Sequence, residues 1–465
     1  MSQIVILGGG PSGLACGMEL FKENINFILI EKYEKIGGLA KTYKFGEFLT
    51  DNGPHRFFSK NSYLYNFIEE LLGEKWIKVD RYTRFYVDGR FYKYPVQLGN
   101  VLRTVPFFKG VKMFMGALYA KVRYSFSKPK NFEEYVVQSF GRPLAEFNMI
   151  NYTEKIWGLN CSQLSADWAK QRIKGLGFGS LIKKLIFSSS GARSMVDAFY
   201  YPDRGTGLIY DAIGEKISTK NEVLTSDEPI SVETENNLIK KVLLKSGKSL
   251  DIDTLVTSIP ITRFLEILDP QPPKEVIDAV KNLKYRSQVY LFITLNRPSV
   301  TKDQWIYFPD ADIPFGRVSE MKNFSKLMAP EDKTSLFIEF FCWKDDEIWN
   351  SSKEELLQLV IPFFERLEFF TKEEIIDTYH IKKDFVYPVY DLGYEENLGI
   401  IKDYLNSFHN LIYIGRPGRF KYTNQDHSLE MGIVAAKSII DGKQYDLELI
   451  GSENEYFEEG KFKED

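Results

Sequence analysis

Residues 4–31 read IVILGGGPSGLACGMELFKENINFILIE, and this stretch decides the fold of the chain. It begins with four apolar residues that predict a short buried strand, and a glycine-rich turn then leads into a helix predicted over Leu14 to Lys22. A second apolar run, predicted as a strand, ends at the acidic residue Glu31. The glycines keep the spacing G-x-G-x-x-G, and the acid follows at about 20 residues, so the stretch predicts a dinucleotide-binding βαβ unit.

The residue types of this turn suit a pyrophosphate. Glycine lets the backbone approach the phosphates, and the helix that follows points its free N–H groups and positive dipole end at their charge. Glu31 can accept hydrogen bonds from both ribose hydroxyls and repels a 2′-phosphate. The residues expected to hold the dinucleotide are Gly8, Gly10, Pro11, Ser12, Gly13, Glu31 and Lys32.

The bulk composition excludes several classes of protein. A chain of 465 residues is long for one core and predicts two domains. Its net charge of −4 gives no reason to expect nucleic acid as a partner. The three cysteines and four histidines lack metal-ligand spacing, so we expect no metal site. The scattered cysteines also argue against a disulfide framework, so we expect a protein of the reducing cytoplasm. No apolar run reaches the ~18 residues of a transmembrane helix.

A second glycine pair, Gly37-Gly38, follows the acid, and a hairpin is predicted after it over Tyr43 to Leu49. Such a pair lets a loop cross close to the cofactor again, although a plain turn between two strands would use the same residues. Here the chain resembles the FAD family that contains amine oxidases, phytoene desaturases, protoporphyrinogen oxidase and UDP-galactopyranose mutase. In that family EK-x-x-x-x-GG-x-x-x-T runs along the FAD. The resemblance implies FAD as cofactor, held also by Gly38, Leu39 and Ala40.

Later segments are similar to the mutase branch of that family: residues 52–57 (NGPHRF), 152–158 (YTEKIWG), 415–426 (GRPGRFKYTNQD) and, less closely, 314–320 (PFGRVSE). The resemblance implies that the main chain of Gly53, Pro54 and His55 lies beside the isoalloxazine. It implies that Tyr152 and Trp157 line the nucleotide-sugar pocket and that Arg317 faces the flavin and the substrate diphosphate. From the last segment it implies cofactor contacts for Gly415, Arg416, Asp426, His427 and Ser428, with Tyr422 close by.

Physical chemistry supports these residue types without the family. Arg317 and Arg416 are predicted at strand ends, the side on which open α/β sheets bind ligands. A guanidinium fork suits phosphate oxygens or the edge of an anionic reduced flavin, although an ordinary ion pair would also explain both arginines. The aromatic residues Tyr152, Trp157 and Tyr422 suit base stacking or phosphate binding, and equally a packed core. Asp426 is predicted to cap the last helix, whose free N–H groups would then face the cofactor.

The chain departs from the mutase pattern at two places. The mutase has a second substrate arginine in R-I-P-V-R-F, whereas this chain reads RIKGLGF over residues 172–178. Lys174 is the candidate substitute, as a point charge without a fork. Asn424 stands where the mutase has an aspartate, and we expect it to contact the substrate.

The expected fold class is α/β: a Rossmann-like FAD-binding domain of the glutathione reductase type with an inserted substrate domain of helices and antiparallel sheet. The FAD-binding domain is predicted to be discontinuous, over residues 1–65, 196–285 and 391–450. The substrate domain comprises a helical part, 66–195, with helices predicted over 98–126 and 166–173 among others, and a sheet part, 286–390, and 451–465 is a polar tail. In the FAD-binding domain, residues 249–258 are predicted to form strand. Basic and aromatic residues alternate over 101–126, which is typical of membrane contact or of ordinary packed helices.

Two enzymatic functions are consistent with these sequence features. The resemblance implies a pyranose/furanose mutase-like enzyme acting on a nucleotide-diphosphate sugar, with N5 of the reduced flavin as covalent catalyst and NAD(P)H as a candidate reductant. The alternative is an FAD-dependent oxidoreductase, similar to amine oxidases or protoporphyrinogen oxidase, that takes hydride from a small or apolar substrate. The missing second arginine and the long helical part favour this alternative, or a different nucleotide sugar. A cofactor-binding protein without catalysis would need the flavin sealed from substrate. The sequence does not predict an oligomeric state.

Overall fold

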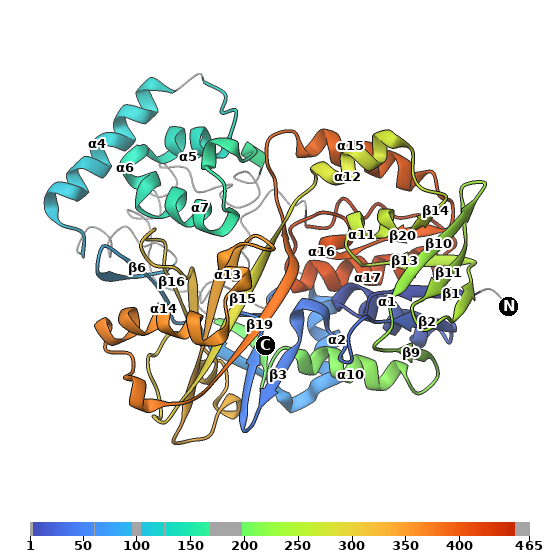
Figure 1. Ribbon diagram of the computed structural model, residues 1–465, viewed down its shortest axis with the longest axis horizontal. Coiled ribbons are helices and arrows are strands. Elements are labelled where there is room, and N and C mark those ends of the chain that lie inside the picture. The colour runs from blue at the N-terminus through green and yellow to red at the C-terminus, as the bar shows by residue number, and fades with distance from the viewer. Residues whose placement is uncertain (1–2, 60, 95–103, 125–126, 168–197, 452–465) are drawn as a thin grey trace.

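The computed structural model describes residues 3–59, 61–94, 104–124, 127–167 and 198–451. A parallel sheet carries the N-terminal βαβ unit, at the right of Figure 1, and a larger mixed sheet with a group of helices lies at the left. The parallel sheet has the order β20-β13-β1-β2-β9. Its strands are β1 (Ile4–Leu7), β2 (Phe27–Ile30), β9 (Glu222–Leu224), β13 (Thr254–Thr257) and β20 (Leu411–Tyr413).

Strand β1 is apolar throughout because it is buried on both faces. Ile4 and Ile6 pack in one apolar cluster and Val5 and Leu7 in another, as the two-residue period of a strand requires. Helices cover the first face: α1 (Pro11–Lys22), α2 (Ser62–Leu72), α10 (Gly207–Ile217) and α17 (Gln425–Ile440). A four-stranded sheet packs in the second cluster: β10 (Pro229–Glu235), β11 (Leu238–Leu244), β12 (Ser249–Asp251) and β14 (Leu268–Asp269).

The seven-stranded sheet has the order β19-β15-β18-β17-β16-β6-β7. Its strands are β6 (Thr83–Val87), β7 (Arg90–Lys93), β15 (Tyr285–Leu295), β16 (Trp305–Tyr307), β17 (Arg317–Glu320), β18 (Thr334–Cys342) and β19 (Ile375–Pro388). Helix α14 (Lys353–Arg366) packs in the apolar cluster on one face, and α13 (Glu347–Asn350) precedes it. The other face carries Tyr290 and Phe292 toward the β3–β4 hairpin, so it is turned to the nucleotide-binding half.

The helical group comprises α4 (Phe107–Arg123), α5 (Phe132–Phe140), α6 (Arg142–Leu144), a π-helical turn (Ala145–Ile150) and α7 (Asn151–Trp157). The remaining elements include β3 (Thr42–Phe45), β4 (Phe48–Asp51), β5 (Trp76–Asp80), β8 (Ala198–Pro202), α11 (Ile261–Glu266), α12 (Lys274–Asn282), α15 (Tyr394–Asn406) and α16 (Gly415–Gly418). In the described part of the chain, no helix combines the length and apolar character that crossing a bilayer requires.

Several sequence expectations need correction. Residues 76–93, expected in a helical part, form β5, β6 and β7, because they pair with strands far along the chain. Residues 249–258 form two strands in different sheets. Helix α1 begins at Pro11 and not at Leu14, since proline suits the first helical position. The helix expected over 98–126 is interrupted before Pro106, the N-cap of α4, and residues 98–103 and 125–126 lie outside the described residues. The same is true of residues 168–173 of the helix expected over 166–173 and of the tail after residue 451.

A buried polar network joins the β3–β4 hairpin to α10. The Asp51 carboxylate is fully buried and accepts hydrogen bonds from the Thr42 and Tyr201 hydroxyls, both at 2.5 Å, and from the Thr206 backbone N–H at 3.1 Å. Burial raises the pKa of Asp51 to about 6, against the opposing effect of these donors. Asp51 directly precedes the segment Asn52–His55, so this network fixes where that segment begins.

We predict that Asp51 makes stability depend on pH. A carboxyl whose folded-state pKa is raised stabilises the fold fully below its unfolded value near 3.8, and this contribution is lost as pH rises through about 6. The Asp51→Asn variant lacks this loss. As the pH rises from 4 to 6, its free energy of unfolding should therefore increase relative to that of the native protein by about 3 kcal/mol, and its melting temperature should rise relative to the native one. Asp312→Asn, at an exposed site, is the control. A difference that stays constant with pH would contradict the prediction.

Candidate functional site

The glycine turn has the geometry of a phosphate cradle. Gly8 has φ +101°, and a β-carbon on Gly13 would lie 2.0 Å from the Gly8 carbonyl oxygen, so neither position accepts a side chain without a shift. Helix α1 follows with Gly10 as N-cap, no side chain capping it and no acidic residue in its first turn. Its first N–H groups are therefore available to an anion.

Glu31 lies at the end of β2 beside this turn. Its side chain is buried and accepts a hydrogen bond from the Gly9 backbone N–H at 2.9 Å and one from Tyr33 N–H at 3.1 Å. The Lys41 ammonium lies 3.7 Å away. Burial lowers the pKa of Lys41, and the nearby Lys383 acts in the same direction. Lys32, also expected at the cofactor, pairs with Glu228 at 2.9 Å instead.

Three glycine segments meet at the start of α1. A β-carbon on Gly38, where φ is +56°, would lie 3.0 Å from the Gly10 α-carbon, and one on Gly415 would lie 3.0 Å from Ser12 Oγ. Asn52 donates to the Leu39 carbonyl oxygen at 3.3 Å, and its buried Oδ1 accepts no hydrogen bond from the described residues. A glycine-walled cradle and an orphaned buried acceptor are what a bound dinucleotide would satisfy, so these residues fit FAD.

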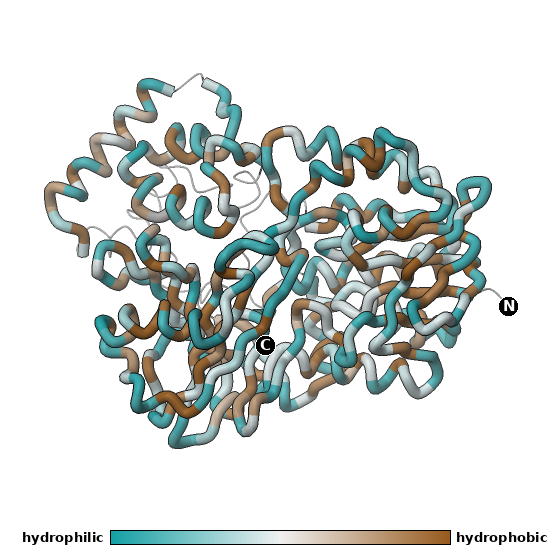
Figure 2. Tube along the Cα trace, viewed as in Figure 1, coloured by the Kyte–Doolittle hydropathy of each residue, from teal (hydrophilic) through white to brown (hydrophobic). Residues whose placement is uncertain are grey.

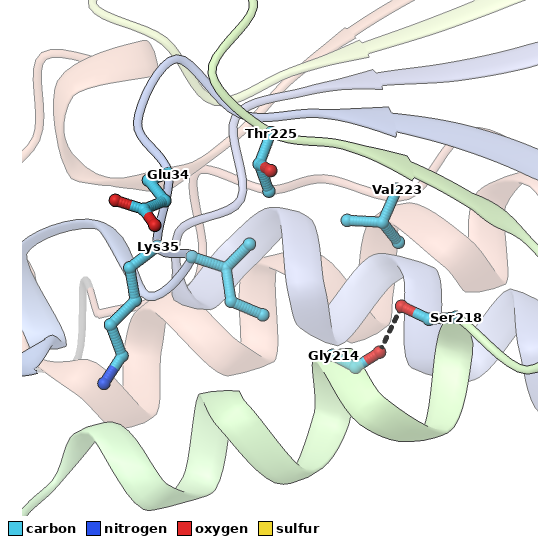
Figure 3. A pocket seen from close by; sticks show the side chains of 7 residues that line it. Glu34, Lys35, Gly214, Ser218, Val223 and Thr225 are labelled. Carbon is cyan, nitrogen blue, oxygen red and sulfur yellow. Dashed lines mark hydrogen bonds between the residues drawn. The ribbon is translucent and has the colours of Figure 1, made fainter.

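A cavity of about 580 Å³ lies next to Glu31, whose backbone N–H bonds to Leu224 on β9. It is lined by the loop Glu34–Ile36, by Gly214 and Ser218 of α10, and by Val223 and Thr225 (Figure 3). The Ser218 hydroxyl donates to the Gly214 carbonyl oxygen at 2.7 Å and is thus turned along its own helix. The cavity is close to the end of β2, where Glu31, the acid expected to bind a ribose, is located.

An ion pair between the partly exposed Arg317 and the buried Glu339 lies on the face of the large sheet that is turned to this cradle. The Arg317 guanidinium binds the Glu339 carboxylate through two hydrogen bonds of 2.6 Å, across the neighbouring strands β17 and β18. A β-carbon on Gly53, where φ is +112°, would lie 3.4 Å from Glu339 Oε1 and 3.5 Å from Arg317 Nη2. The segment that the sequence places beside the flavin therefore touches this pair.

Four tyrosines surround the ion pair. Tyr152 packs edge-on to Tyr307 with ring centres 5.3 Å apart, and Tyr307 faces the Arg317 guanidinium at 6.0 Å. Tyr387 and Tyr422 stack at 5.6 Å. Each of these rings keeps part of its surface accessible. Burial raises the pKa of Tyr152 well above its ordinary value, so the hydroxyl remains a neutral donor.

Arg416 is held differently from what the sequence suggests. It lies in the short helix α16 and not at a strand end, and its Nε donates to the Thr423 carbonyl oxygen at 2.9 Å. Its Nη2 donates to the same oxygen, and its guanidinium lies over the rings of Tyr387 and Tyr422 at 5.4 and 4.8 Å. Arg416 thus closes its own loop and stacks on two of the four tyrosines.

His55 lies close to both arginines. Desolvation and the charges of Arg416 and Arg317 lower its pKa to about 4. Its Nε2 is 3.2 Å from the Asn52 carbonyl oxygen, a distance at which the neutral ring donates a hydrogen bond. The ring is therefore neutral at physiological pH and adds no third positive charge to the cluster.

Other predicted residues take supporting positions. Trp157 is 1% exposed and packs behind the cluster against Tyr387 and Tyr390, so it presents no free face.

The start of α17 holds three more of the predicted residues. Asp426 does not cap α17, because Asn424 is the N-cap. Asp426 lies buried in the first turn, with its pKa raised by burial. His427 Nδ1 accepts from the Asn424 N–H at 3.4 Å, and the Ser428 hydroxyl is 3.1 Å from that of Thr423. Lys174 lies outside the described residues.

Sequence reasoning missed Glu339, Tyr307, Tyr387 and the role of Lys155. A signal existed for Glu339, because it is the one charged residue in the apolar run 335–342, where a buried carboxylate needs a partner. The Lys155 ammonium donates to four backbone carbonyls, those of Phe308, Asp310, Ile313 and Phe315, at 2.6–3.2 Å. It ties α7, which carries Tyr152, to the loop that leads into Arg317.

Comparisons with known proteins place the chain among flavoproteins over nearly its whole length. The profile of a family described as flavin containing amine oxidoreductase matches residues 11–395. A relative described as a probable UDP-galactopyranose mutase, from Klebsiella pneumoniae, is 20% identical over 445 residues, which are 94% of each chain. A crystal structure of reduced UDP-galactopyranose mutase has a TM-score of 0.86 at 23% identity over 98% of each chain. A putrescine oxidase bound to putrescine has a TM-score of 0.65 at 15% identity over 95% of this chain and 99% of that one.

The cradle predicts a specific glycine defect. In Gly13→Ala the new methyl group would meet the Gly8 carbonyl oxygen, so the turn must open and cofactor affinity should fall about tenfold or more. The measurement is the FAD dissociation constant of apoprotein, together with the flavin-to-protein ratio after purification. Gly399→Ala, in α15 with no atom within 4 Å of the added carbon, is the control. Equal FAD affinity in both variants would show that this turn does not hold the cofactor.

Proposed function

This chain belongs to the flavin containing amine oxidoreductases and is an FAD-dependent enzyme, and we propose that its substrate is a nucleotide-diphosphate sugar. The proposed reaction is mutase-like: the sugar changes between its pyranose and furanose ring forms without net oxidation. The resemblance of residues 52–57, 152–158 and 415–426 to the mutase branch supports this choice. The names of two relatives point in the same direction, since both are described as UDP-galactopyranose mutases.

The observation that carries the proposal is the chemistry of the tyrosine and arginine cluster. Arg317 and Arg416 bring two positive charges, Glu339 brings one negative charge, and the neutral His55 brings none, so the cluster has a net positive charge. Four tyrosine rings with accessible surface surround these groups. A site for an amine or an apolar substrate would be lined by apolar side chains or by negative charge. A positive, phenol-rich site suits a diphosphate.

Arg317 has the geometry to bind a phosphate oxygen. Its Nε and Nη2 are committed to Glu339, and its Nη1 donates to no described residue. Glu339 therefore fixes the fork and leaves one edge for the ligand, at a site where water is largely excluded and the interaction is correspondingly strong. We assign Arg317 to neutralising the diphosphate as it leaves the anomeric carbon, where negative charge on it increases.

The tyrosines complete this assignment. The Tyr152 hydroxyl is a neutral donor suited to phosphate oxygens, and the stacked pair Tyr387–Tyr422 offers a flat aromatic surface. Arg416 stabilises this stacked pair through its cation–π contacts with both rings, and its hydrogen bonds to Thr423 hold the guanidinium in position. When bound and reduced, FAD supplies a nucleophilic nitrogen to the anomeric carbon.

The first prediction concerns the arginine fork. UDP binding to the reduced holoenzyme should weaken about 10- to 100-fold in Arg317→Lys, which keeps the charge but not the bidentate geometry that holds Glu339. Isothermal titration before and after dithionite reduction measures the effect. Arg366→Lys, on exposed α14 surface, is the control. If no UDP or GDP nucleotide binds in either redox state while an amine substrate consumes oxygen, the chain is an oxidase and the proposal is wrong.

The second prediction compares two lysines, Lys155 and Lys322, each of which donates to four backbone carbonyls. Lys322 donates to those of Pro298, Pro330, Glu331 and Lys333, but it follows the end of β17 opposite to Arg317. Lys155→Met should lose about 2–3 kcal/mol of unfolding free energy because part-buried carbonyls lose their charged donor, and Lys322→Met should lose less because two of its four contacts are exposed. Only Lys155→Met should also weaken UDP binding, by about tenfold, since only it shifts the loop before Arg317. Equal UDP affinity in the two variants would contradict the positioning role.

A further inference from the structure

Helix α4 presents a wide apolar face to solvent. Phe107, Phe108 and Tyr119 are 77%, 85% and 65% exposed. The other large exposed apolar residues of the helix are Val111, Phe114, Met115, Leu118 and Val122. At 3.6 residues per turn, all eight fall within an arc of about 140° on the helix surface. The face is therefore continuous along the 17 residues of α4.

The opposite face of α4 is made of small residues, and this is the face that packs on the protein. Ala117, Ala120 and Met113 are its buried residues. A β-carbon on Gly116 would lie 2.7 Å from the Pro143 ring, so α4 lies tightly against α6. A helix that served only the core would turn its large side chains inward. Here the arrangement is reversed, and the apolar area left outside needs another explanation.

The charges of α4 have one sign. The helix carries Lys109, Lys112, Lys121 and Arg123 and no acidic residue, whereas the whole chain has a net charge of −4. By the same helical geometry these cations flank the apolar arc on both sides. These four positively charged residues form a basic border, in which Lys109 also pairs with Asp88. Aromatic residues between basic borders are typical of helices that lie in the headgroup region of a bilayer.

We propose that α4 docks on an anionic lipid surface, lying in the membrane plane with its aromatic face among the acyl chains. The positive border is complementary to anionic headgroups. It disfavours the other occupant, a second copy of this chain, because a two-fold contact between two α4 helices would bring like charges together. α4 forms the outer edge of the helical group in Figure 1, and brown segments recur along it in Figure 2. The nucleotide-binding half lies on the far side of that group, so docking leaves it uncovered.

The test is flotation of the full-length holoenzyme with vesicles of phosphatidylcholine alone or with one-third phosphatidylglycerol. Binding is expected only to the anionic vesicles and should fall as salt is added. The triple variant Phe107→Ser, Phe108→Ser, Tyr119→Ser should bind at least tenfold more weakly, with an unchanged flavin spectrum. Its control replaces three residues exposed on other elements, Ile230→Ser, Leu327→Ser and Ile376→Ser. The control should float like the native protein.

A second pair of variants tests the charge. Lys112→Gln with Arg123→Gln should weaken anionic vesicle binding several-fold, whereas Lys216→Gln with Lys240→Gln, at exposed positions elsewhere, should not. Sedimentation velocity tests whether a second copy of this chain, and not a lipid surface, covers the apolar face of α4. If the serine triple variant converts a dimer to a monomer, or if the native protein ignores both kinds of vesicle, the lipid proposal is overturned.

Discussion

The Arg317–Glu339 ion pair is the interaction on which the rest of the site depends. The Glu339 carboxylate is buried in the large sheet and Arg317 is only partly exposed, and the desolvation cost is offset because the fork geometry is complete, with two hydrogen bonds of 2.6 Å. The register that sets Arg317 opposite Glu339 also sets Tyr307 opposite Arg317 and Tyr290 opposite Glu339, so one row of paired residues crosses four strands. Removing either partner would leave an uncompensated charge in that row.

The segment Asn52–His55 links this row to the cofactor cradle. Asn52 bonds to Leu39 of the second glycine loop, Gly53 lies against the ion pair, and His55 is kept neutral by both arginines. Asp51, just before it, is anchored in a buried network that reaches α10 and β8. A shift in the cradle would therefore move the segment that lines the cluster. In the proposed function, cofactor binding and substrate binding share this short piece of backbone.

Much of the cradle is predictable from sequence because its constraints are local. Only glycine fits the positions where φ is positive or where two backbones touch, and the acid must end the second strand. The spacing of these residues in the sequence therefore identifies them. The family profile confirms the resemblance to FAD enzymes. The cluster is less predictable because it forms by long-range pairing. Nothing near Tyr307 or Tyr387 in the sequence distinguishes them from core aromatics, and β6 pairs with β16, more than 200 residues later. The substrate contact expected of Asn424 stays a prediction, and the structure adds that this residue is the N-cap of α17, a position that its residue type favours.

The most direct test of the account is a crystal structure of the dithionite-reduced holoenzyme soaked with UDP. The account predicts a diphosphate oxygen within hydrogen-bond distance of Arg317 Nη1, with the Arg317–Glu339 fork intact and a tyrosine of the cluster against the nucleotide. A nucleotide bound elsewhere, or an Arg317 whose remaining edge faces only protein while the cluster excludes the soaked ligand, would contradict it.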